Sequence, residues 1–383
     1  MKHNSADFFR GGIEPLKGRQ KPPGGPLART CTLLAAILFA GAGCGGMYGP
    51  GTGNAANSLT IAAWNVEALF DGEETGTEYD EYRGPGNWNK AKYNGRITTI
   101  SEAINVMGAP DLLALEEVEN VPVLEDLMRG AGAGYRYSFF AKESGAALGL
   151  GVISRLPFAG TKTHSVVMNG DSAPRPMLEI LLEHNGAPMV IFICHWKSKL
   201  GGDEKTELTR RASAFIIARR TAEIQEESPG CPVLILGDLN ENHDEFYRQA
   251  GLYPSALLPD DPEAAAISGQ GDFIVLSQNK PPRGDFFPPG TAVFYSPWTG
   301  ELDGGSYYYK NSWETIDHIL LSAEWFDSSG WEFSDCAVIR GDPFTGASGL
   351  PAAYNPRTGY GLSDHLPLAV TVVNPGAASA LPP

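Results

Sequence analysis

The stretch Gly361-Leu362-Ser363-Asp364-His365-Leu366-Pro367-Leu368 places a carboxylate and an imidazole side by side, after a glycine and before an apolar run. Five similar clusters precede it, each beside another apolar run: Trp64-Asn65-Val66-Glu67, Leu115-Glu116-Glu117-Val118-Glu119-Asn120, Cys194-His195-Trp196-Lys197-Ser198, Gly237-Asp238-Leu239-Asn240 and Thr315-Ile316-Asp317-His318. Apolar runs bounded in this way predict buried strands. Strands that carry acids, amides or histidines at their ends predict a sheet protein in which these polar groups lie close together at one edge.

The rest of the chain predicts one domain built from such strands and a few helices. The chain has 383 residues, of which 42% are hydrophobic, so it can bury a sizeable core. The expected strands are residues 59–64, 111–115, 147–154, 177–182, 188–194, 232–236, 316–321 and 366–373, and the expected helices are residues 94–107, 121–129 and 206–226. Residues 243–311, rich in Pro, Gly and Asp, predict a long irregular region, which in a domain is usually functional.

The N-terminus predicts export. A polar stretch with an excess of basic residues runs to Arg29, and the apolar run 33–40 that follows is shorter than the ~20 residues of a spanning helix. The small residues before Cys44 resemble the cleavage site of bacterial lipoproteins, although Gly41 stands where those proteins usually have Leu. Residues 1–44 are therefore expected to be a signal peptide, which ends either in a lipidated Cys44 on a membrane surface or in plain cleavage and release to the periplasm or the outside. Residues 45–58 predict a flexible linker, 59–373 the folded domain and 374–383 a disordered tail.

Charge and cysteine content narrow the function classes. The formal net charge is −16, which argues against tight, processive binding along duplex DNA but not against a brief encounter with a phosphate ester. The folded domain holds Cys194, Cys231 and Cys336, which do not amount to a disulfide framework. Cys194 lies in an apolar run and is expected to be a buried, inert thiol, while a disulfide between Cys231 and Cys336 is left open.

The strand-end clusters contain the groups that metal-assisted phosphate chemistry uses. They supply carboxylates (Glu67, Glu117, Asp238 and Asp364), amides (Asn65 and Asn240) and imidazoles (His195 and His365). Carboxylate and amide oxygens suit a hard divalent cation, and histidine can exchange protons near neutral pH. Neither histidine has the close His or Cys neighbours of a zinc site, so Mg²⁺ is expected, with Mn²⁺ or Ca²⁺ as alternatives.

Other polar residues are expected to have ordinary roles. Glu116, Glu119, Asp111 and His318 are interpreted as solvated or capping residues, His164, His184 and His243 as surface histidines, and Arg175 as a surface residue rather than a phosphate ligand. For Lys197, Ser198 and Lys199, contact with phosphate and contact with water are equally compatible with the sequence.

In this order, the clusters resemble the endonuclease/exonuclease/phosphatase superfamily, over roughly residues 59–373. That superfamily includes DNase I, exonuclease III, apurinic endonucleases, neutral sphingomyelinases and inositol polyphosphate 5-phosphatases. The resemblance implies an α/β fold, a four-layer α/β sandwich in which two packed mixed β-sheets are flanked by helices, with the site at one edge. It also implies metal-dependent hydrolysis of phosphate esters.

The resemblance assigns expected roles to individual residues. Asn65, Glu67, Glu117 and Asp364 match the metal side of the site, with Glu117 as the principal metal carboxylate. His195, Asp238, Asn240, Asp317 and His365 match the catalytic groups. Among these, Asp238 and Asn240 orient the attacking water, His195 is a general acid or phosphate donor, and Asp317 orients His365, the general base or phosphate ligand. Glu116 stands where a Gln is usual, and Glu67 where an Asp is frequent.

The expected function is an exported, metal-dependent phosphodiesterase, most simply a nuclease that meets DNA or RNA transiently as its substrate. The alternative is a phospholipid hydrolase of the sphingomyelinase type or an inositol- or sugar-phosphate phosphatase, which the acidic charge and a lipidated Cys44 would suit. A non-catalytic binding module is a third class, against which the intact set of acids and histidines argues. No obligate protein partner is expected.

Overall fold

The structure is a computed structural model that describes residues 57–84, 86–168, 171–172, 175–269 and 271–376, all within one compact unit, Tyr48–Pro383. The predicted signal peptide, Cys44, nearly all of the predicted linker and residues 377–383 of the predicted tail lie outside the described residues. Within the described ranges, no helix is both long enough and apolar enough to span a membrane.

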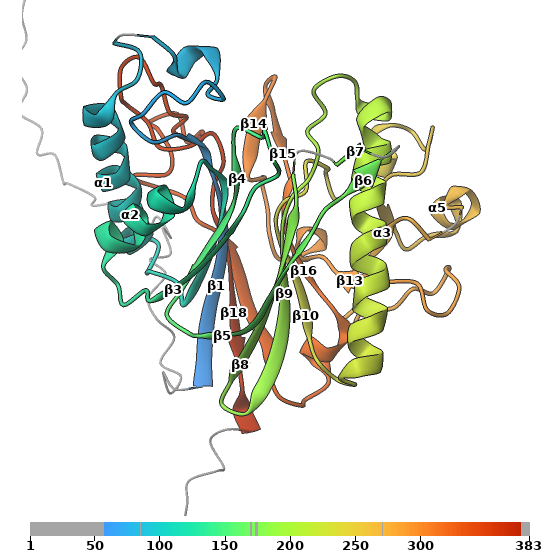
Figure 1. Cartoon of the computed structure of the whole chain (residues 1–383). Coiled ribbons are helices and arrows are strands. Elements are labelled where there is room, and N and C mark those ends of the chain that lie inside the picture. Colours follow the sequence, from blue (N-terminus) through green and yellow to red (C-terminus); the bar gives the residue numbers. More distant parts are fainter. Residues whose placement is uncertain (1–56, 85, 169–170, 173–174, 270, 377–383) are drawn as a thin grey trace, which may run out of the picture. The chain divides into compact units, whose positions relative to one another are not determined.

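Two β-sheets form the centre of this unit (Figure 1). The first has six strands in the order β17-β18-β1-β2-β4-β3. Their bounds are β1 Ser58–Leu69, β2 Leu112–Val118, β3 Tyr137–Ala141, β4 Gly149–Ser154, β17 Glu332–Val338 and β18 Leu368–Val373. The second has eight strands in the order β11-β12-β13-β16-β10-β9-β8-β5. Their bounds are β5 Phe158–His164, β8 Met177–His184, β9 Ala187–His195, β10 Val233–Asp238, β11 Leu257–Pro259, β12 Ile274–Ser277, β13 Val293–Tyr295 and β16 Asp317–Leu321.

Helices and two small hairpins complete the unit. The α-helices are α1 Lys90–Val106, α2 Val121–Ala131, α3 Asp203–Glu227, α4 Glu245–Arg248 and α5 Pro262–Ile267. The 3-10 helices are η2 Asp80–Tyr82, η3 Pro297–Thr299 and η4 Ala323–Phe326. The hairpins pair β6 Val167–Met168 with β7 Asp171–Ser172 and β14 Tyr307–Tyr309 with β15 Ser312–Glu314.

The layers follow from the alternation of apolar side chains along the strands. In β1, Ile61 and Ala63 pack between the two sheets, whereas Ala62 and Trp64 pack on the opposite face of the first sheet. Helices α1 and α2 cover that outer face, and α3 covers the outer face of the second sheet (Figure 1). The order helix, sheet, sheet, helix confirms the expected four-layer α/β sandwich.

Strand direction brings the polar clusters to one edge. Strand β1 runs parallel to β2, and β9 runs parallel to β10, so the carboxyl ends of each pair lie together. In the second sheet, His195 of β9 pairs with Asp238 of β10. On its other side, β10 pairs with the antiparallel strand β16, where Asp238 lies opposite Asp317, the first residue of β16. The register therefore sets three polar residues from distant parts of the sequence side by side.

Residues 243–311 are not the irregular region that their composition predicts. They contain α4, β11, α5, β12, β13, η3 and β14, and three of these strands extend the second sheet. Strands β11, β12 and β13 have only three or four residues each, which is too short to produce a periodic pattern. Strands β3, β5 and β17, which the pattern also does not predict, lie at sheet edges and are mostly exposed or partly buried, so they lack the long buried apolar run of the central strands.

The cysteines Cys194, Cys231 and Cys336 are free and buried. Cys231 packs in the core between the second sheet and α3, whereas Cys336 packs in the core between the two sheets. A layer of sheet separates them, and the disulfide that the sequence leaves open does not form.

Candidate active site

The strand ends surround a polar cavity of about 240 Å³. It is lined by Asn65, Glu67, Glu117, Arg175, His195, Ser198, Asp238, Asn240, Tyr307, Ile316, Asp364 and His365. Of the nine residues predicted to form the site, eight line this cavity, and the ninth, Asp317, lies behind His365 and hydrogen-bonds to it. The structure therefore brings all nine together in what we call the catalytic pocket.

One side of the pocket, the acid wall, consists of Glu67, Glu117 and Asp364. Glu67 and Glu117 have positive φ angles of 53° and 64°, which residues other than glycine rarely adopt. Each lies where the strand register shifts, between β1 and β2 for Glu67 and between β2 and β4 for Glu117. A bulge of this kind redirects a side chain that regular alternation would send elsewhere.

Backbone N–H groups hold the acid wall in place. The amide of Ala68 donates to Glu117 Oε2 at 2.8 Å. The amides of Tyr354 and Asp364 donate to Glu67 Oε2 at 2.7 and 2.9 Å. These bonds occupy one oxygen of each glutamate, and the second oxygen of each receives no hydrogen bond from the described residues. Both glutamates therefore keep an oxygen for a ligand in the pocket.

Arg96 of α1 holds the backbone around Glu67 in place. Its guanidinium is buried and donates to the carbonyl oxygens of Val66, Glu67 and Ala68, and it lies 3.7 Å from the centre of the Tyr354 ring. The sequence motifs do not reveal this residue. The signal that was available is its place on the buried side of a helix, where a charged residue needs partners.

The acid wall gathers three carboxyl groups, and Arg96 and His365 offset only part of their charge. Burial, together with the nearby Asp364 carboxylate, raises the pKa of Glu67 to about 7. Burial also raises the pKa of Asp364, and the Glu117 carboxylate adds to this, although His365 acts in the opposite direction. A cation bound among these groups would remove the repulsion, so their chemistry fits a hard divalent ion.

A second group of site residues, the histidine wall, consists of His195, Asp238, Asn240, Asp317 and His365. Asp238 accepts two hydrogen bonds. The side chain of Asn65 donates from Nδ2 to Asp238 Oδ2 at 3.2 Å, and the backbone N–H of Asn240 donates to Asp238 Oδ1 at 2.8 Å. His195 Nε2 lies 3.4 Å from Asp238 Oδ2 and 3.8 Å from Glu117 Oε1. His195 therefore stands between the two walls.

His365 is oriented by a chain of contacts. Its Nδ1 lies 2.9 Å from Asp317 Oδ2, which also accepts a hydrogen bond from Ser306 Oγ at 2.6 Å. The ring of Tyr307 stacks on the imidazole, with centroids 4.6 Å apart. Because Nδ1 is engaged with a carboxylate, Nε2 is the nitrogen available to the pocket. Ser306 and Tyr307 lie in the region predicted to be irregular, so no strand-end motif indicates them.

The two histidines have opposite electrostatic surroundings. Burial lowers the pKa of His195 well below its ordinary value, and Arg175, His365 and Lys197 add to this. Burial would also lower the pKa of His365, but the carboxylates of Asp317 and Asp364 outweigh it and hold that pKa well above the ordinary value. One imidazole is therefore neutral and the other charged near neutral pH, the arrangement of a proton acceptor facing a proton donor. The roles expected from the resemblance, His195 as general acid or phosphate donor and His365 as general base or phosphate ligand, stay a prediction.

The distances between possible metal-ligand atoms differ between the acid wall and the histidine wall. Among the described residues, the one group of three whose ligand atoms all lie within 4.8 Å of one another is Asp238, Asp317 and His365. Within this group, His365 Nδ1 and Asp317 Oδ2 lie 2.9 Å apart and hydrogen-bond to each other. The predicted ligands Glu67, Glu117 and Asp364 do not converge as closely, so a cation held there would have to draw these carboxylates together.

Several residues expected to be solvated or capping are buried in or near the site. Glu116 is completely buried, with no hydrogen-bond partner for either carboxyl oxygen among the described residues. Burial and the charges of Asp317 and Asp238 raise its pKa well above the ordinary value, so it is a neutral acid. His318 is buried, with Nε2 2.8 Å from the Glu241 carbonyl oxygen. Of the others, Glu119 and Asp111 do cap backbone, accepting from the amides of Asp71 and Thr60.

The residues interpreted as lying on the surface also have partners. His164 Nε2 lies 2.7 Å from Glu179 Oε2, His243 Nδ1 lies 2.8 Å from Thr315 Oγ1, and His184 stacks on Trp331. Arg175 lines the catalytic pocket and donates to the Trp196 carbonyl, so it is a site residue rather than a surface one. Ser198 also lines the pocket, whereas Lys199 pairs with Glu245.

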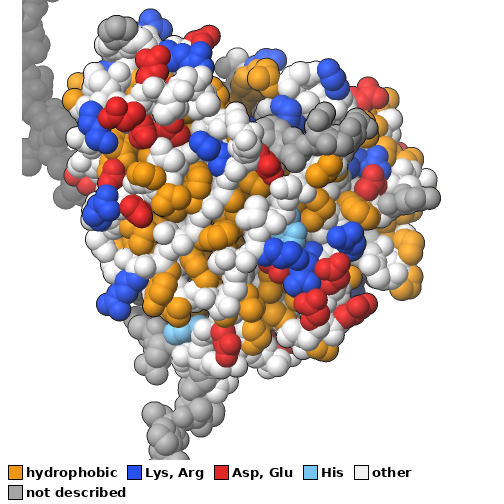
Figure 2. Space-filling view, viewed as in Figure 1, with side chains coloured by type: hydrophobic (Ala, Val, Ile, Leu, Met, Phe, Trp, Pro, Cys, Tyr) orange, Lys and Arg blue, Asp and Glu red, His pale blue; other side chains and the backbone are white. Residues whose placement is uncertain are grey.

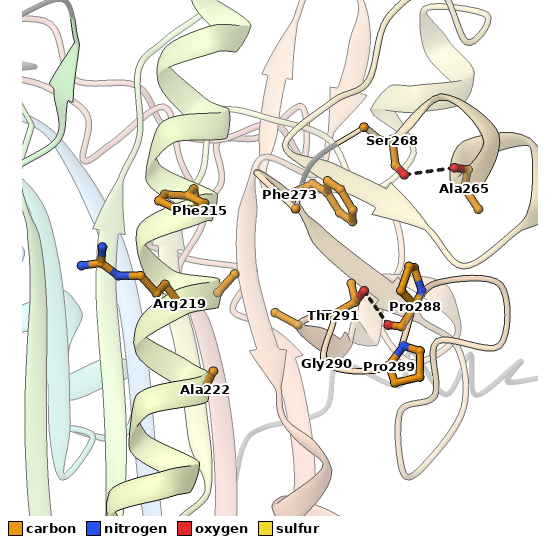
Figure 3. A pocket seen from close by; sticks show the side chains of 14 residues that line it. Phe215, Arg219, Ala222, Ala265, Ser268, Phe273, Pro288, Pro289, Gly290 and Thr291 are labelled. Carbon is orange, nitrogen blue, oxygen red and sulfur yellow. Dashed lines mark hydrogen bonds between the residues drawn. The ribbon is translucent and has the colours of Figure 1, made fainter.

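A larger cavity, of about 570 Å³, lies between α3 and the segments around Phe273 and Pro288 (Figure 3). Its one charged lining residue is Arg219, which extends away from Phe273 in Figure 3 and pairs with Glu223. Nothing in this lining can supply acid–base chemistry, so its size does not make it the active site.

A sequence profile described as the endonuclease/exonuclease/phosphatase family matches residues 60–257, which is more than half of the chain. The chain therefore belongs to the endonuclease/exonuclease/phosphatase family, and its general class is that of phosphodiester hydrolases. The matched segment contains the acid wall except Asp364, and it ends before Asp317 and His365. No curated protein matches the chain.

Solved structures share the fold at low identity. A truncated TDP2 from Caenorhabditis elegans is 12% identical, with 82% of this chain and 97% of that chain covered and a TM-score of 0.50. An endonuclease/exonuclease/phosphatase from Bacteroides vulgatus is 14% identical, with 83% and 99% covered and a TM-score of 0.49. A functionally unknown conserved protein from Enterococcus faecalis V583 is 16% identical, with 82% and 100% covered and a TM-score of 0.49.

Proposed function

We propose that the chain is a metal-dependent phosphodiesterase that cleaves DNA or RNA, a nuclease exported from the cell. The observation that carries the proposal is the catalytic pocket itself. It places a group of buried carboxyl groups beside two histidines with opposed pKa shifts. Hydrolysis of a phosphodiester needs both parts, since charge must be stabilised on the phosphate while protons move at the attacking and leaving oxygens.

The acid wall is the proposed cation site. Glu67, Glu117 and Asp364 would hold a Mg²⁺ or Mn²⁺ ion, or Ca²⁺, with Asn65 beside them. When bound, the ion supplies positive charge against the phosphate oxygens and favours ionised water. The donor set fits because it offers carboxylate and amide oxygens with no nearby cysteine, and because burial has raised the pKa of two of the acids.

The histidine wall is the proposed proton-transfer system. Asp238 and the side-chain amide of Asn240 would orient a water molecule, and the backbone N–H of Asn240 fixes Asp238 by donating to its Oδ1. The neutral His195 beside Asp238 would accept the proton of that water. His365 presents Nε2 to the pocket and donates a proton or a hydrogen bond to the phosphate or the leaving oxygen. Asp317 stabilises the charged imidazole through Nδ1.

The charge of the chain bears on the choice of substrate. On the face shown in Figure 2, basic and acidic side chains are mixed, and the basic ones form no continuous band. With a net charge of −16, this supports brief contact with a few phosphates rather than a grip along a duplex. The same charge favours the second candidate, a hydrolase of phospholipids or of inositol or sugar phosphates.

Purified protein assayed with Mg²⁺, Mn²⁺ or Ca²⁺ tests the proposal. The substrates are plasmid DNA, single-stranded DNA, RNA, sphingomyelin and inositol phosphates, each with an EDTA control. The proposal expects metal-dependent cleavage of at least one nucleic acid. Cleavage of sphingomyelin or inositol phosphates alone would establish the second candidate, and activity that survives EDTA would refute the metal dependence.

The location is a separate proposal, which rests on residues 1–44 of the sequence. Export should leave a mature N-terminus at or near Cys44, and an acylated Cys44 should hold the protein at a membrane surface. Mass spectrometry of the native N-terminus decides the matter. An intact Met1 would refute export, and an unmodified Cys44 would refute the anchor alone.

A further inference from the structure

A second cavity, of about 360 Å³, opens directly beside the catalytic pocket. The two cavities share Glu117, Arg175, His195 and Ser198. Because they share these residues, a phosphate held in the catalytic pocket has its neighbouring chemical group at the entrance of the second cavity. That cavity is therefore positioned to recognise a part of the substrate that does not react.

The walls of the second cavity are largely apolar and partly aromatic. The apolar lining residues are Ala146, Ala147, Leu148, Leu150, Pro176 and Leu200. Tyr79 also lines the cavity, and its ring, 40% exposed, is held edge-on against Phe70 with centroids 5.3 Å apart. Leu200 lies on the rim with 85% of its surface exposed. Exposed apolar groups beside a polar active site favour a flat apolar group in this part of the cavity.

Part of the cavity lining, which we call its floor, comes from the segment that joins β3 to β4 and from the start of β4. A Cβ atom at Gly149 would lie 2.5 Å from the Ala141 carbonyl oxygen and 2.8 Å from the Phe140 ring, so this position has no room for a side chain. The close packing of the hairpin preserves the space above it, which Ala146 and Ala147 line with small side chains.

Two cations without acidic partners line the cavity. Arg175 and Lys197 form no ion pair with any carboxylate of the described residues. Burial lowers the pKa of Lys197, and the charges of Arg175 and Arg210 add to this, as expected for like charges held close together. In a chain with 45 acidic and 29 basic residues, two neighbouring unpaired cations indicate a site for an anion supplied by the ligand.

We propose that this cavity is a base subsite: it receives one unpaired nucleobase adjacent to the scissile phosphate, while Arg175 and Lys197 bind the next phosphate of the strand. The inference rests on the proposed nuclease function. The volume is at the lower end of the roughly 300–1,000 Å³ typical of ligand pockets, so it suits one nucleoside and not a base pair. An apolar floor beside an aromatic ring suits a base that is free to stack, so the substrate class is single-stranded nucleic acid.

The first test uses the unaltered protein and needs no variant. A single-stranded oligonucleotide should be cleaved with a kcat/KM about 10-fold or more above the same sequence in a duplex, since one base–aromatic contact is worth about this factor. A single-stranded oligonucleotide with an abasic residue at the cleavage site should lose a similar factor. Equal cleavage of the duplex, or of the abasic strand, would overturn the base subsite.

The second test fills the cavity. Ala147→Phe should raise KM for the single strand about 10-fold, with hydrolysis of methyl p-nitrophenyl phosphate, which has no base, unchanged. Ala265→Phe, a matched change in the remote cavity of Figure 3, should leave the hydrolysis of both substrates unchanged.

The third test removes one of the two cations. Lys197→Met should raise KM for the single strand and flatten its salt dependence. An unchanged KM in Ala147→Phe, or a defect confined to sphingomyelin, would overturn the proposal. No hydrolysis of any phosphodiester by the parent protein would instead refute the proposed function.

Discussion

The two walls of the catalytic pocket are built in different ways. In the histidine wall, His195, Asp238 and Asp317 occupy paired positions on three neighbouring strands, so the register of one sheet sets their spacing. In the acid wall, Glu67 and Glu117 sit on bulges with positive φ and are held by backbone amides. Strand register therefore sets the spacing of His195, Asp238 and Asp317, whereas Glu67 and Glu117 depend on irregular backbone that other residues support.

The two walls also differ in how their charges are paired. Within the histidine wall, charges are paired, since His365 faces Asp317 and its pKa is raised. Within the acid wall, like charges are close, and burial with this repulsion raises the pKa of Glu67 to about 7. The first wall is complete without a ligand and the second is not. Substitutions should therefore impair turnover in one wall and cation affinity in the other.

The largest effect should come from the histidine wall. His365→Ala removes a proton-transferring group and should lower kcat at least ~10²-fold, with the half-saturating metal concentration little changed. Asp317→Asn should reproduce part of the loss, because the imidazole keeps its place but loses its charged partner. His184→Ala is the control, since His184 lies near the β8–β9 turn and stacks on Trp331. Steady-state kinetics at saturating metal checks this, and an Asp317→Asn variant as active as the parent would disprove the pairing.

The next effect should appear in the acid wall. Glu117→Gln removes one anionic oxygen ligand and should raise the half-saturating Mg²⁺ or Mn²⁺ concentration about 10- to 100-fold, because hard cations bind carboxylates much better than amides. Metal titration of activity, together with direct binding of Mn²⁺, provides the measurement. Glu183→Gln, on the exposed side of β8, is the matched control. An unchanged half-saturation and rate would remove Glu117 from the metal site.

The raised pKa of Glu67 predicts how metal affinity depends on pH. Its ordinary value is 4.5 and its value here is about 7, so the folded protein holds this proton until the pH exceeds about 7. A cation must displace that proton, so the half-saturating metal concentration should rise about tenfold per pH unit below pH ~7. Glu67→Gln should flatten this dependence. A pH-independent metal affinity in the parent would show that Glu67 does not titrate with the metal site.

A smaller effect is expected from the support of the acid wall. Arg96→Lys keeps a positive charge, but one ammonium group cannot reproduce the guanidinium's bonds to the carbonyls of Val66, Glu67 and Ala68. The half-saturating metal concentration should rise about 10-fold, the scale of a lost outer-sphere partner, while kcat at saturating metal is largely recovered. Arg129→Lys, exposed on α2, is the control. A loss of kcat that excess metal does not restore would contradict a positioning role.

The smallest expected effect is on the free energy of unfolding. It concerns Glu179, a carboxylate outside the site that is paired with cationic side chains. Burial would raise the pKa of Glu179, but hydrogen bonds from His164 and Arg220 lower it to about 2. A lowered pKa stabilises the fold above pH ~4.5, and this contribution disappears as the pH falls toward 2. Glu179→Gln should therefore lower the free energy of unfolding by about 1–3 kcal/mol at pH 7 and by less at pH ~3. Urea unfolding checks this, and Glu67→Gln, whose pKa is shifted the other way, should not lower stability at pH 7.

Much of the fold could be predicted because the central strands are apolar runs. The strands that contribute site residues, β1, β2, β9, β10 and β16, all lie within their sheets and show this pattern. The edge strands β3, β5 and β17 do not, because most of their side chains are exposed or only partly buried. The short strands β11, β12 and β13 could not be recognised since three or four residues contain no period.

The local sequence specifies which chemical groups follow the buried strands, because an apolar run and the residue after it can be read without knowing the fold. Tertiary structure decided how those groups act. The burial of Glu116, the support from Arg96 and the contacts of Ser306 and Tyr307 with the Asp317–His365 pair all depend on segments far apart in the chain. The opposed pKa shifts of His195 and His365 do so as well, because desolvation and Coulomb interactions sum over every neighbour in space. Local sequence does not contain that sum.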